Sequence, residues 1–377
     1  MAANGSDTKS LVTALLGERA AGMTQDQIVD ELNALRKRLE REQDRTQVIT
    51  DVITGIVKGL PPVLALPPVS RPKSPKDEVP HVAMLDVSDV HWGEFVDLAI
   101  TGGLNAYSYD EALRRGEELR RGIVRLVDMQ RRVYPVDVLY VNMFGDMVTG
   151  EDIYPGQAFQ IDRALTEQVF LGADWFAAFV RDMASRFDQV KVMAVPGNHG
   201  RGYRKGQNHP RTNWDTLVYR MMKLRLEAIK NVDVQITDSS WLLYHIPGHE
   251  NFRHVLIHGD EARSWMTIPW YGFERAGQRL ESMLGAVLDY VHAGHHHNEA
   301  RWANNRMEFL INGSWVGGSA LSVQKMLRVS RPVQNLFFCH PKRGVVSHYP
   351  IQLADLPKLT ADERGIWGYG AKPEGEK

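Results

Sequence analysis

The sequence of 377 residues lacks most features that would place a protein in an oxidising compartment or a membrane. A single cysteine, Cys339, excludes a disulfide framework and a structural zinc site built from several thiolates, and it is typical of a reducing compartment. The N-terminus lacks the pattern of a secretory signal, and no run approaches the roughly 18 apolar residues of a membrane span. We therefore expect a cytoplasmic protein with no membrane partner.

The chain also lacks an excess of charge of either sign. Its formal net charge is -1 and its pI is about 6.9, so no global positive field attracts it to nucleic acid. Any binding of nucleic acid must then come from local basic patches. The hydrophobic content of 43% supports an ordinary globular core.

Four regions follow one another along the chain. Residues 1–60 are expected to be helical, with the apolar residues Ile28, Leu32, Leu35 and Leu39 at heptad-like spacing. Seven prolines in residues 61–80 predict an extended linker. A main domain is expected over residues 81–355, followed by a tail over residues 356–377. The apolar stripe predicts a homodimer contact through the N-terminal helices, and packing on the chain's own main domain explains it equally well.

The main domain reads as α/β. Apolar runs at 81–87, 136–144 and 190–195 alternate with helical patterns at 109–133, 160–187 and 214–229. Strand-like runs with fewer helices follow at 241–246, 254–258, 290–293, 306–311 and 333–338. We therefore expect two packed mixed β-sheets flanked by helices in four layers, with the N-terminal helices as an extension.

Aspartate, asparagine and histidine residues, which can all bind metal ions, follow five of the expected strands. In chain order these residues are Asp89 and His91, Asp146, Asn198 and His199, His258, and His295 and His297. If the first segment stays extended, alternation directs Asp89 and His91 to the same side. In open α/β sheets, ligands bind at the edge where the strands end.

Carboxylate and amide oxygens mixed with imidazoles suit Mn, Fe or Zn better than Ca or Mg alone. The ligands are too numerous for one ion. Two divalent cations bridged by a carboxylate can lower the pKa of a shared water and clamp phosphate oxygens during in-line attack. The pattern therefore indicates metal-dependent hydrolysis of phosphate esters.

The ordered set Asp89-x-His91, Gly145-Asp146, Gly197-Asn198-His199, His258 and Gly294-His295-x-His297 resembles the calcineurin-like metallophosphoesterase family. The resemblance spans about residues 81–350. It implies that Asp89, His91 and His297 hold the first metal and that Asn198, His258 and His295 hold the second. It also implies that Asp146 bridges the two metals. Mn is the expected metal, and Fe, Zn and Mg are the alternatives.

The same resemblance implies that His199 contacts the scissile phosphate or protonates the leaving oxygen. One departure from the family pattern concerns this residue. Many members have an acidic residue after the Gly-Asn-His triplet, and this chain has Gly200. The partner that orients His199 is therefore open.

Three neighbouring residues are interpreted as non-ligands. His296 lies between two ligands and should point away from the metals. Asp86 should face away from Asp89 for the same reason, and Asp260 is expected to support the site through a hydrogen bond.

A basic segment directly follows His199. Arg201, Tyr203, Arg204 and Lys205 are predicted to bind substrate, because cations beside a hydrolytic site suit a polyanion. Among family branches, the chain is most similar to the DNA-repair exonucleases, which implies a DNA nuclease with nucleic acid as substrate. In that case the apolar stripe of the N-terminal helices predicts either a homodimer or the recruitment of an ATPase or replication partner. The alternative is a phosphodiesterase or phosphomonoesterase for small substrates such as cyclic nucleotides or phosphoproteins, which the near-zero net charge favours. A non-catalytic nucleic-acid-binding module fits less well, because the ligands of all five motifs are intact.

Overall fold

The computed structural model describes residues 63–75, 77–201, 212–249, 252–263, 269–319, 322–323 and 329–355, and four single residues before them, Gln27, Asp30, Gly55 and Gly59. The chain divides into two compact units, Met1–Gly55 and Ile56–Lys377. The expected N-terminal helices fall almost wholly outside the described residues, as does the expected tail. The helical extension, the dimer contact and the domain boundaries therefore stay predictions.

The larger sheet of the second unit has six strands in the order β11-β10-β1-β2-β3-β4. Its four parallel strands are β1 (Val82–Val87), β2 (Val138–Phe144), β3 (Gln189–Val195) and β4 (Val232–Ile236). The antiparallel strands β10 (Val333–His340) and β11 (Gly344–Gln352) complete it. Because β1, β2 and β3 are parallel neighbours, the loops that follow them meet at one edge of the sheet.

The smaller sheet has five strands in the order β5-β6-β7-β9-β8. These are β5 (Trp241–His245), β6 (Arg253–Ile257), β7 (Tyr290–Ala293), β8 (Ala300–Asn304) and β9 (Met307–Ile311). Strands β6, β7 and β9 are parallel, and β5 and β8 pair antiparallel at the two edges. Both sheets are therefore mixed.

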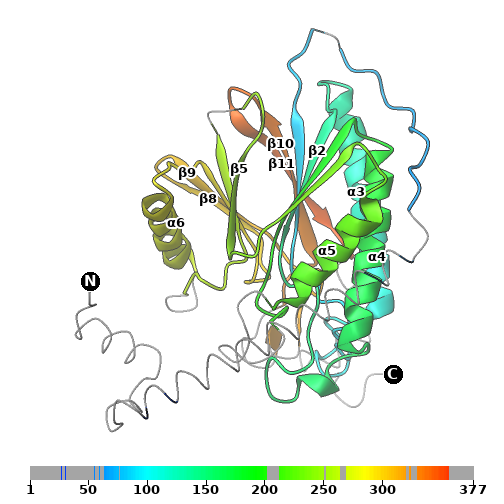
Figure 1. Ribbon diagram of the computed structural model, residues 1–377, viewed down its shortest axis with the longest axis vertical. Helices are drawn as coiled ribbons and strands as arrows, with labels where there is room; N and C mark the ends of the chain where they lie inside the picture. The colour runs from blue at the N-terminus through cyan, green and yellow to red at the C-terminus, as the bar shows by residue number, and fades with distance from the viewer. Residues whose placement is uncertain are drawn as a thin grey trace, which may run out of the picture. The chain divides into compact units, whose positions relative to one another are not determined.

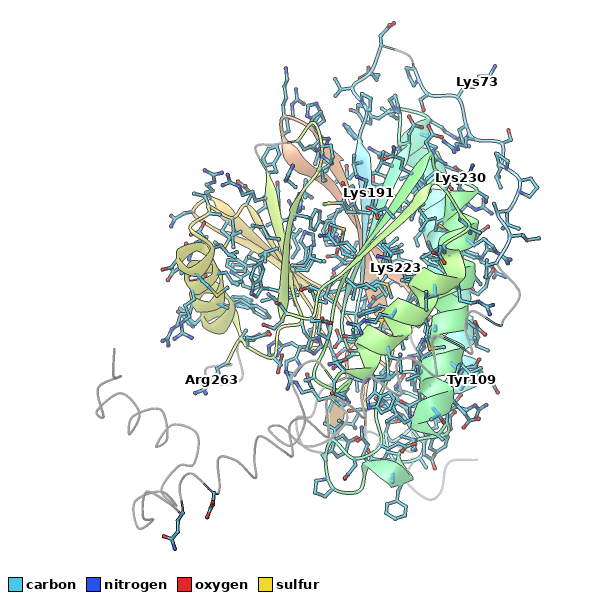
Figure 2. All side chains as sticks on the ribbon, viewed as in Figure 1. Lys73, Tyr109, Lys191, Lys223, Lys230 and Arg263 are labelled. Atoms are coloured by element: carbon cyan, nitrogen blue, oxygen red, sulfur yellow. The ribbon has the colours of Figure 1, made fainter. Side chains whose placement is uncertain are left out.

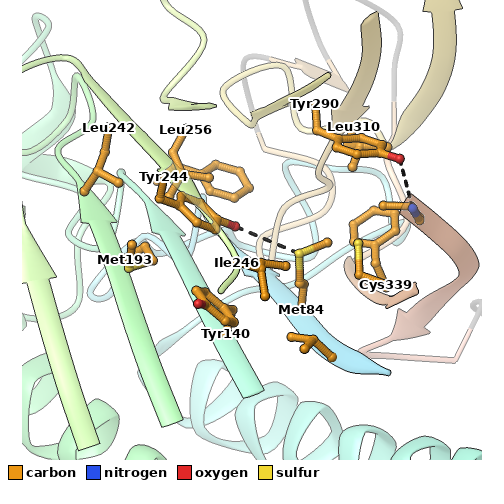
Figure 3. Packing of buried hydrophobic residues seen from close by; sticks show 14 of the residues in the cluster. Met84, Tyr140, Met193, Leu242, Tyr244, Ile246, Leu256, Tyr290, Leu310 and Cys339 are labelled. Atoms are coloured by element: carbon orange, nitrogen blue, oxygen red, sulfur yellow. Dashed lines mark hydrogen bonds between the residues drawn. The ribbon is translucent and has the colours of Figure 1, made fainter. Parts of the chain in front are cut away.

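The two sheets face each other, with helices on both outer sides (Figure 1). Helices α3 (Tyr109–Arg131), α4 (Leu165–Ala184) and α5 (Trp214–Leu226) cover the larger sheet, and α6 (Trp270–Leu284) covers the smaller. Between the sheets lies a core in which Tyr140 stacks on Tyr244 at 5.4 Å, and Met84 and Leu256 pack nearby (Figure 3). The expected four-layer α/β class with two mixed sheets is confirmed.

The orientation of the larger sheet places the ends of its parallel strands beside the start of α3. Figure 2 labels Tyr109, the first residue of α3, and Lys230, just before β4, at opposite ends of the sheet. The loops after β1, β2 and β3 lie at the Tyr109 end, since each strand begins at the other.

The expected boundaries hold to within a few residues except at one helix. The pattern at 160–187 yields a helix only from Leu165 to Ala184. The preceding residues pair with the loop after β1 instead of joining the helix. Ile161 forms an antiparallel bridge with Glu94, and the backbone N–H of Asp162 donates to the carbonyl of Gly93 at 2.9 Å. A short 3₁₀ helix, η2 (Gln157–Phe159), lies before them.

The proline-rich segment forms no helix or strand over residues 63–75, yet it contacts the main domain. The backbone N–H of Val69 donates to the carbonyl of Ser185 at 2.8 Å, and Arg71 pairs with Asp188 at 2.7 Å. Among the described residues, no helix has both the length and the apolar character needed to cross a membrane.

Candidate metal centre

Eight polar residues from five strand ends meet at one edge of the two sheets. The loops after β1, β2 and β3 supply Asp89, His91, Asp146, Asn198 and His199. The loop after β6 supplies His258, and the loop after β7 supplies His295 and His297. Two glycines permit the close approach of the β2 and β3 loops, because a Cβ on Gly197 would lie 2.3 Å from the backbone nitrogen of Asp146. This explains the glycine that precedes the ligand in each of these two motifs.

Three overlapping groups of potential ligands are assembled there, and one of them joins His91, Asp146 and His199. Asp89, His91 and His297 place their ligand atoms within 4.8 Å of one another. The Nε2 atoms of His91 and His297 are 3.2 Å apart, and Nε2 of His297 is 3.4 Å from Oδ1 of Asp89. This is the set that the family resemblance assigns to the first metal.

The second group contains Asp146, His258 and His295, again within 4.8 Å. Oδ1 of Asn198 lies 2.9 Å from Nε2 of His258, which brings the amide oxygen into the same group. Oδ2 of Asp146 is 3.2 Å from Nε2 of His258 and 3.9 Å from Nε2 of His91. Asp146 therefore stands between the two groups, where a bridging carboxylate has to be.

The tautomer of His258 tests whether these residues suit a cation. Its Nδ1 lies 2.8 Å from the carbonyl oxygen of Phe144 and so carries the proton that this oxygen accepts. Nε2 is then the atom that faces the oxygens of Asp146 and Asn198. It shares either a proton or a cation with them, because two oxygens facing a bare lone pair would repel it. The buried His and Asp groups are thus consistent with a dinuclear metal site.

Backbone strain is concentrated on the same residues. Six non-glycine residues in the described part of the chain have left-handed backbone, and five of them are candidate ligands with φ between 52° and 65°, namely Asp89, His91, Asp146, His295 and His297. Such conformations cost about 1–3 kcal/mol each and persist where the surrounding structure imposes them. Strain concentrated in this way is typical of functional sites.

Charge and burial displace the pKa values of the ligands in opposite directions. Burial alone would raise the pKa of Asp146, but the nearby His258 and His199 hold it well below its usual range. Burial opposes protonation of His258, and the carboxylate of Asp146 outweighs it and raises the pKa of His258. Burial and the adjacent His258 lower the pKa of His295 to about 4. The histidines therefore respond unequally to protons, which compete with metal for the same atoms.

His199 is oriented by a backbone oxygen. Its Nδ1 lies 2.8 Å from the carbonyl oxygen of Thr149, and its ring is 4.6 Å from the ring of His91. The Thr149 carbonyl also accepts a hydrogen bond of 2.6 Å from Nε2 of Gln157. The partner that the sequence left open at Gly200 is therefore a carbonyl in the β2 loop, and Nε2 of His199 is the atom left for substrate.

Two acidic residues near the site were missed by the sequence interpretation. Asp215, fully buried at the start of α5, accepts hydrogen bonds from the backbone N–H groups of Asp146 and Gly197, both at 2.9 Å. Glu94 has a side chain only 12% exposed, and its Oε2 lies 3.6 Å from Nδ1 of His91. Asp215 resembles an ordinary first-turn acid in the sequence, and only the proximity of Glu94 to the first motif could have indicated it.

The basic segment is described only at its beginning. Arg201 forms a salt bridge of 2.5 Å with Asp260, which follows the ligand His258 closely in the chain. Tyr203, Arg204 and Lys205 lie outside the described residues, so their contact with substrate stays a prediction. Arg201, two residues after His199, has its charge already paired.

The residues interpreted as non-ligands make other contacts. The ring of His296 lies 5.4 Å from the ring of Phe273 on α6. Oδ2 of Asp86 lies 2.8 Å from Nδ1 of His292, between the sheets. None of the three potential metal groups among the described residues contains His296, Asp86 or Asp260.

No family model matches this chain, and no curated protein has a similar sequence. Among solved structures, an archaeal phosphodiesterase is similar over 72% of this chain and 99% of its own, with 9% identity and a TM-score of 0.31. Vps29 from Entamoeba histolytica in complex with zinc is similar over 72% of this chain and 98% of its own, with 12% identity and a TM-score of 0.28. Structural similarity at such low sequence identity and TM-score assigns neither a family nor a function to this chain. Any functional proposal must therefore rest on the geometry of the site.

Proposed function

We propose that this chain is a calcineurin-like metallophosphoesterase that hydrolyses phosphodiester bonds with the help of two divalent cations. The observation that carries the proposal is the position of Asp146 between two ligand groups, 3.9 Å from His91 of the first and 3.2 Å from His258 of the second. One shared carboxylate between two sets of imidazoles is the arrangement of a dinuclear hydrolytic centre.

The residues divide into holding and reacting groups. Asp89, His91 and His297 would hold one cation, Asn198, His258 and His295 the other, and Asp146 both. When bound, such a pair supplies positive charge for the phosphoryl oxygens and lowers the pKa of a water molecule. His199 is fixed through Nδ1 on the carbonyl of Thr149, so its Nε2 can donate a proton to the leaving oxygen.

Our finer proposal is that the phosphodiester belongs to nucleic acid, as in a DNA nuclease of the exonuclease type, with Mn as the cation. It is supported by the four cations in residues 201–211, directly after His199. One observation favours a smaller substrate, because Asp260 neutralises Arg201, the first cation of this segment. A phosphodiesterase for small nucleotide esters is therefore the second candidate.

The test begins with protein stripped of metal by a chelator and returned to Mn, Zn or Mg one at a time. Substrates are methyl p-nitrophenyl phosphate as a simple diester, p-nitrophenyl phosphate as a monoester, and single- and double-stranded DNA. We expect metal-dependent hydrolysis of the diester, with DNA cleavage if the finer proposal holds. Hydrolysis of the monoester alone, or hydrolysis without metal, would contradict the proposal.

Matched variants separate the two kinds of residue. Asp146→Asn should lose activity and bound metal together, whereas His199→Ala should lose about a hundredfold in kcat while it retains both metals, measured by elemental analysis. Asp233→Asn on β4 and His245→Ala on β5 replace exposed residues of the same types and serve as controls. Full activity in Asp146→Asn would place the reaction elsewhere.

A further inference from the structure

The loop between β2 and α4 is fixed to the catalytic edge by two buried glutamines. Gln168 accepts hydrogen bonds from the backbone N–H groups of Thr149 at 3.1 Å and Gly150 at 3.0 Å. Gln157 donates to the carbonyl of Thr149 and accepts from the backbone N–H of Ile153 at 2.7 Å. Both side chains belong to residues that are only 1% exposed. The loop is thus held in place by the same carbonyl that orients His199.

The outward side of this loop carries aromatic rings that the core does not use. Phe159 is 91% exposed and Tyr154 is 37% exposed. The ring of Tyr154 lies 6.4 Å from the ring of His199, nearly edge-on at 74°. A second loop adds Phe95, 43% exposed, whose backbone N–H donates to the carbonyl of Gln160 at 2.8 Å. Tyr154 therefore lies beside the catalytic histidine, and the exposed rings of Phe159 and Phe95 belong to the same two hydrogen-bonded loops.

Exposed rings at this place call for a ligand. Large apolar side chains grouped on a surface mark binding sites more often than chance, and a rigid loop keeps the entropy cost of binding low. The occupant has to reach the rings while its phosphate lies at His199 and the metal ligands. Of the groups attached to biological phosphodiesters, a nucleobase offers a flat π face one sugar away from the phosphate, and bases stack on aromatic side chains without regard to sequence.

We propose that Tyr154, Phe159 and Phe95 form an aromatic platform on which a nucleobase of the substrate stacks, next to the scissile phosphate. This inference rests on the proposed function and assigns the residues that recognise the nucleobase of the substrate. Tyr154, nearest to His199, holds the base adjoining the scissile bond, and its hydroxyl donates to Oε1 of Gln160 at 3.2 Å, which keeps the ring in place. Phe159 and Phe95 lie further along the same pair of loops.

The test compares two diesters with the same leaving group. Thymidine 5′-(p-nitrophenyl phosphate) carries a base, and methyl p-nitrophenyl phosphate carries none and has no second ring to imitate one. The measured quantity is the ratio of kcat/KM for the first substrate to kcat/KM for the second. Because stacking on an aromatic side chain is lost on truncation, Tyr154→Ala with Phe159→Ala should lower this ratio about tenfold.

Three comparisons keep the result interpretable. Tyr154→Phe retains the ring and should retain the ratio, whereas Tyr154→Leu should not. Phe170→Leu replaces a ring on α4 that is also 37% exposed, and it should leave the ratio unchanged. An equal loss on both substrates in the double variant would show a merely structural loop and overturn the platform, as would an unchanged ratio.

A binding measurement separates this inference from the proposed function. Fluorescently labelled oligothymidylate and an abasic strand of equal length carry the same phosphates, and their anisotropy can be titrated with the chelator-treated protein. We expect the wild type to bind oligothymidylate more tightly and the double variant to bind both alike. Wild-type hydrolysis of the methyl ester without any preference for bases would leave the phosphoesterase standing and remove the platform. Tighter binding of the strand with bases, without hydrolysis of any ester, would support the platform and remove the phosphoesterase.

Discussion

The carboxylate of Asp215 accepts a hydrogen bond of 2.9 Å from the backbone N–H of Asp146, the residue between the two ligand groups. The same carboxylate accepts from Met147 at 2.9 Å and from Gly197 at 2.9 Å. One buried side chain from α5 therefore fixes the loops after β2 and β3 to each other. Burial, followed by the neighbouring charge of Asp146, raises the pKa of Asp215 to about 6, so cations bound at Asp146 would favour its ionised form.

Replacement of this carboxylate by an amide should loosen the metal centre. In Asp215→Asn one side of the group becomes a donor that faces backbone N–H groups, and we expect unfolding free energy to fall by about 2–3 kcal/mol. Affinity for Mn should fall about tenfold to a hundredfold, as for other residues that support ligands. Chemical denaturation and calorimetric titration measure the two effects. Asp233→Asn is the control, and unchanged Mn affinity in Asp215→Asn would show that the clamp does not position Asp146.

Gly200 is required by the packing of the same clamp. A Cβ at this position would lie 2.2 Å from Oδ1 of Asn213, which caps α5 by accepting from the backbone N–H of Asp215 at 2.8 Å. Gly200→Ala should displace this cap and lower the melting temperature, with a cost of about 1 kcal/mol for the cap alone. Gly200→Asp should cost more, because it adds a carboxylate beside Asp215.

The double variant Gly200→Ala with Asn213→Gly tests the cause. Glycine at an N-cap costs only a few tenths of a kcal/mol and removes the amide that the new Cβ meets. Partial recovery of the melting temperature is therefore expected. If the loss of melting temperature in the double variant equals the sum of the losses in the two single variants, the effect of Gly200→Ala comes from some other contact.

Gln157 should influence catalysis through the carbonyl of Thr149, which it shares with His199. Gln157→Leu removes one of the two donors to this oxygen and frees the loop, so His199 loses its fixed position. We expect kcat for the simple diester to fall about tenfold while the metal content stays at the wild-type level. Gln189→Leu, at an exposed position at the start of β3, is the control. If metal content and kcat fell together, Gln157 would act on the metal ligands and not on His199 through the carbonyl of Thr149.

The candidate ligands could be grouped from the sequence because each lies in a loop just after a strand. Local pattern places the strand, and strand ends share an edge, so residues as distant as Asp89 and His297 could be grouped without a structure. Asp215 and Gln157 could not be found in this way. Asp215 acts on Asp146 across 69 positions, and nothing in its own helix announces a partner in another loop.

Helix α6 was missed for a related reason. Gly272 and Gly277 weaken the helical pattern, since glycine is unfavourable inside a helix. The structure explains Gly277, because a Cβ there would lie 2.5 Å from the sulfur of Met307 on β9. Tertiary packing thus overrides local propensity at this position, and a single sequence does not show such a contact.

The buried chain Asp86, His292, His254 predicts how stability depends on pH. Nδ1 of His292 lies 2.8 Å from Oδ2 of Asp86, and Nδ1 of His254 lies 3.1 Å from Nε2 of His292. The two protons therefore point toward Asp86. The ring of His254 is stacked between Tyr244 at 5.2 Å and Tyr290 at 4.8 Å. Burial, and next the neighbouring His292, hold the pKa of His254 well below its usual 6.5.

Because the folded pKa of His254 is lowered, its stabilising effect is present above the unfolded value of 6.5 and is lost as the pH falls below it. Each pH unit in that range should remove about 1.4 kcal/mol of unfolding free energy, since only the unfolded state takes up the proton. His254→Phe keeps a ring between the tyrosines but removes the titrating group. We expect this variant to be about 1–3 kcal/mol less stable near pH 8, where Nε2 of His292 loses its donor, and to lose less stability on acidification. Denaturation curves from about pH 8 to about pH 5 should therefore converge for wild type and variant, whereas parallel curves would mean that His254 takes up its proton equally in the folded and unfolded states.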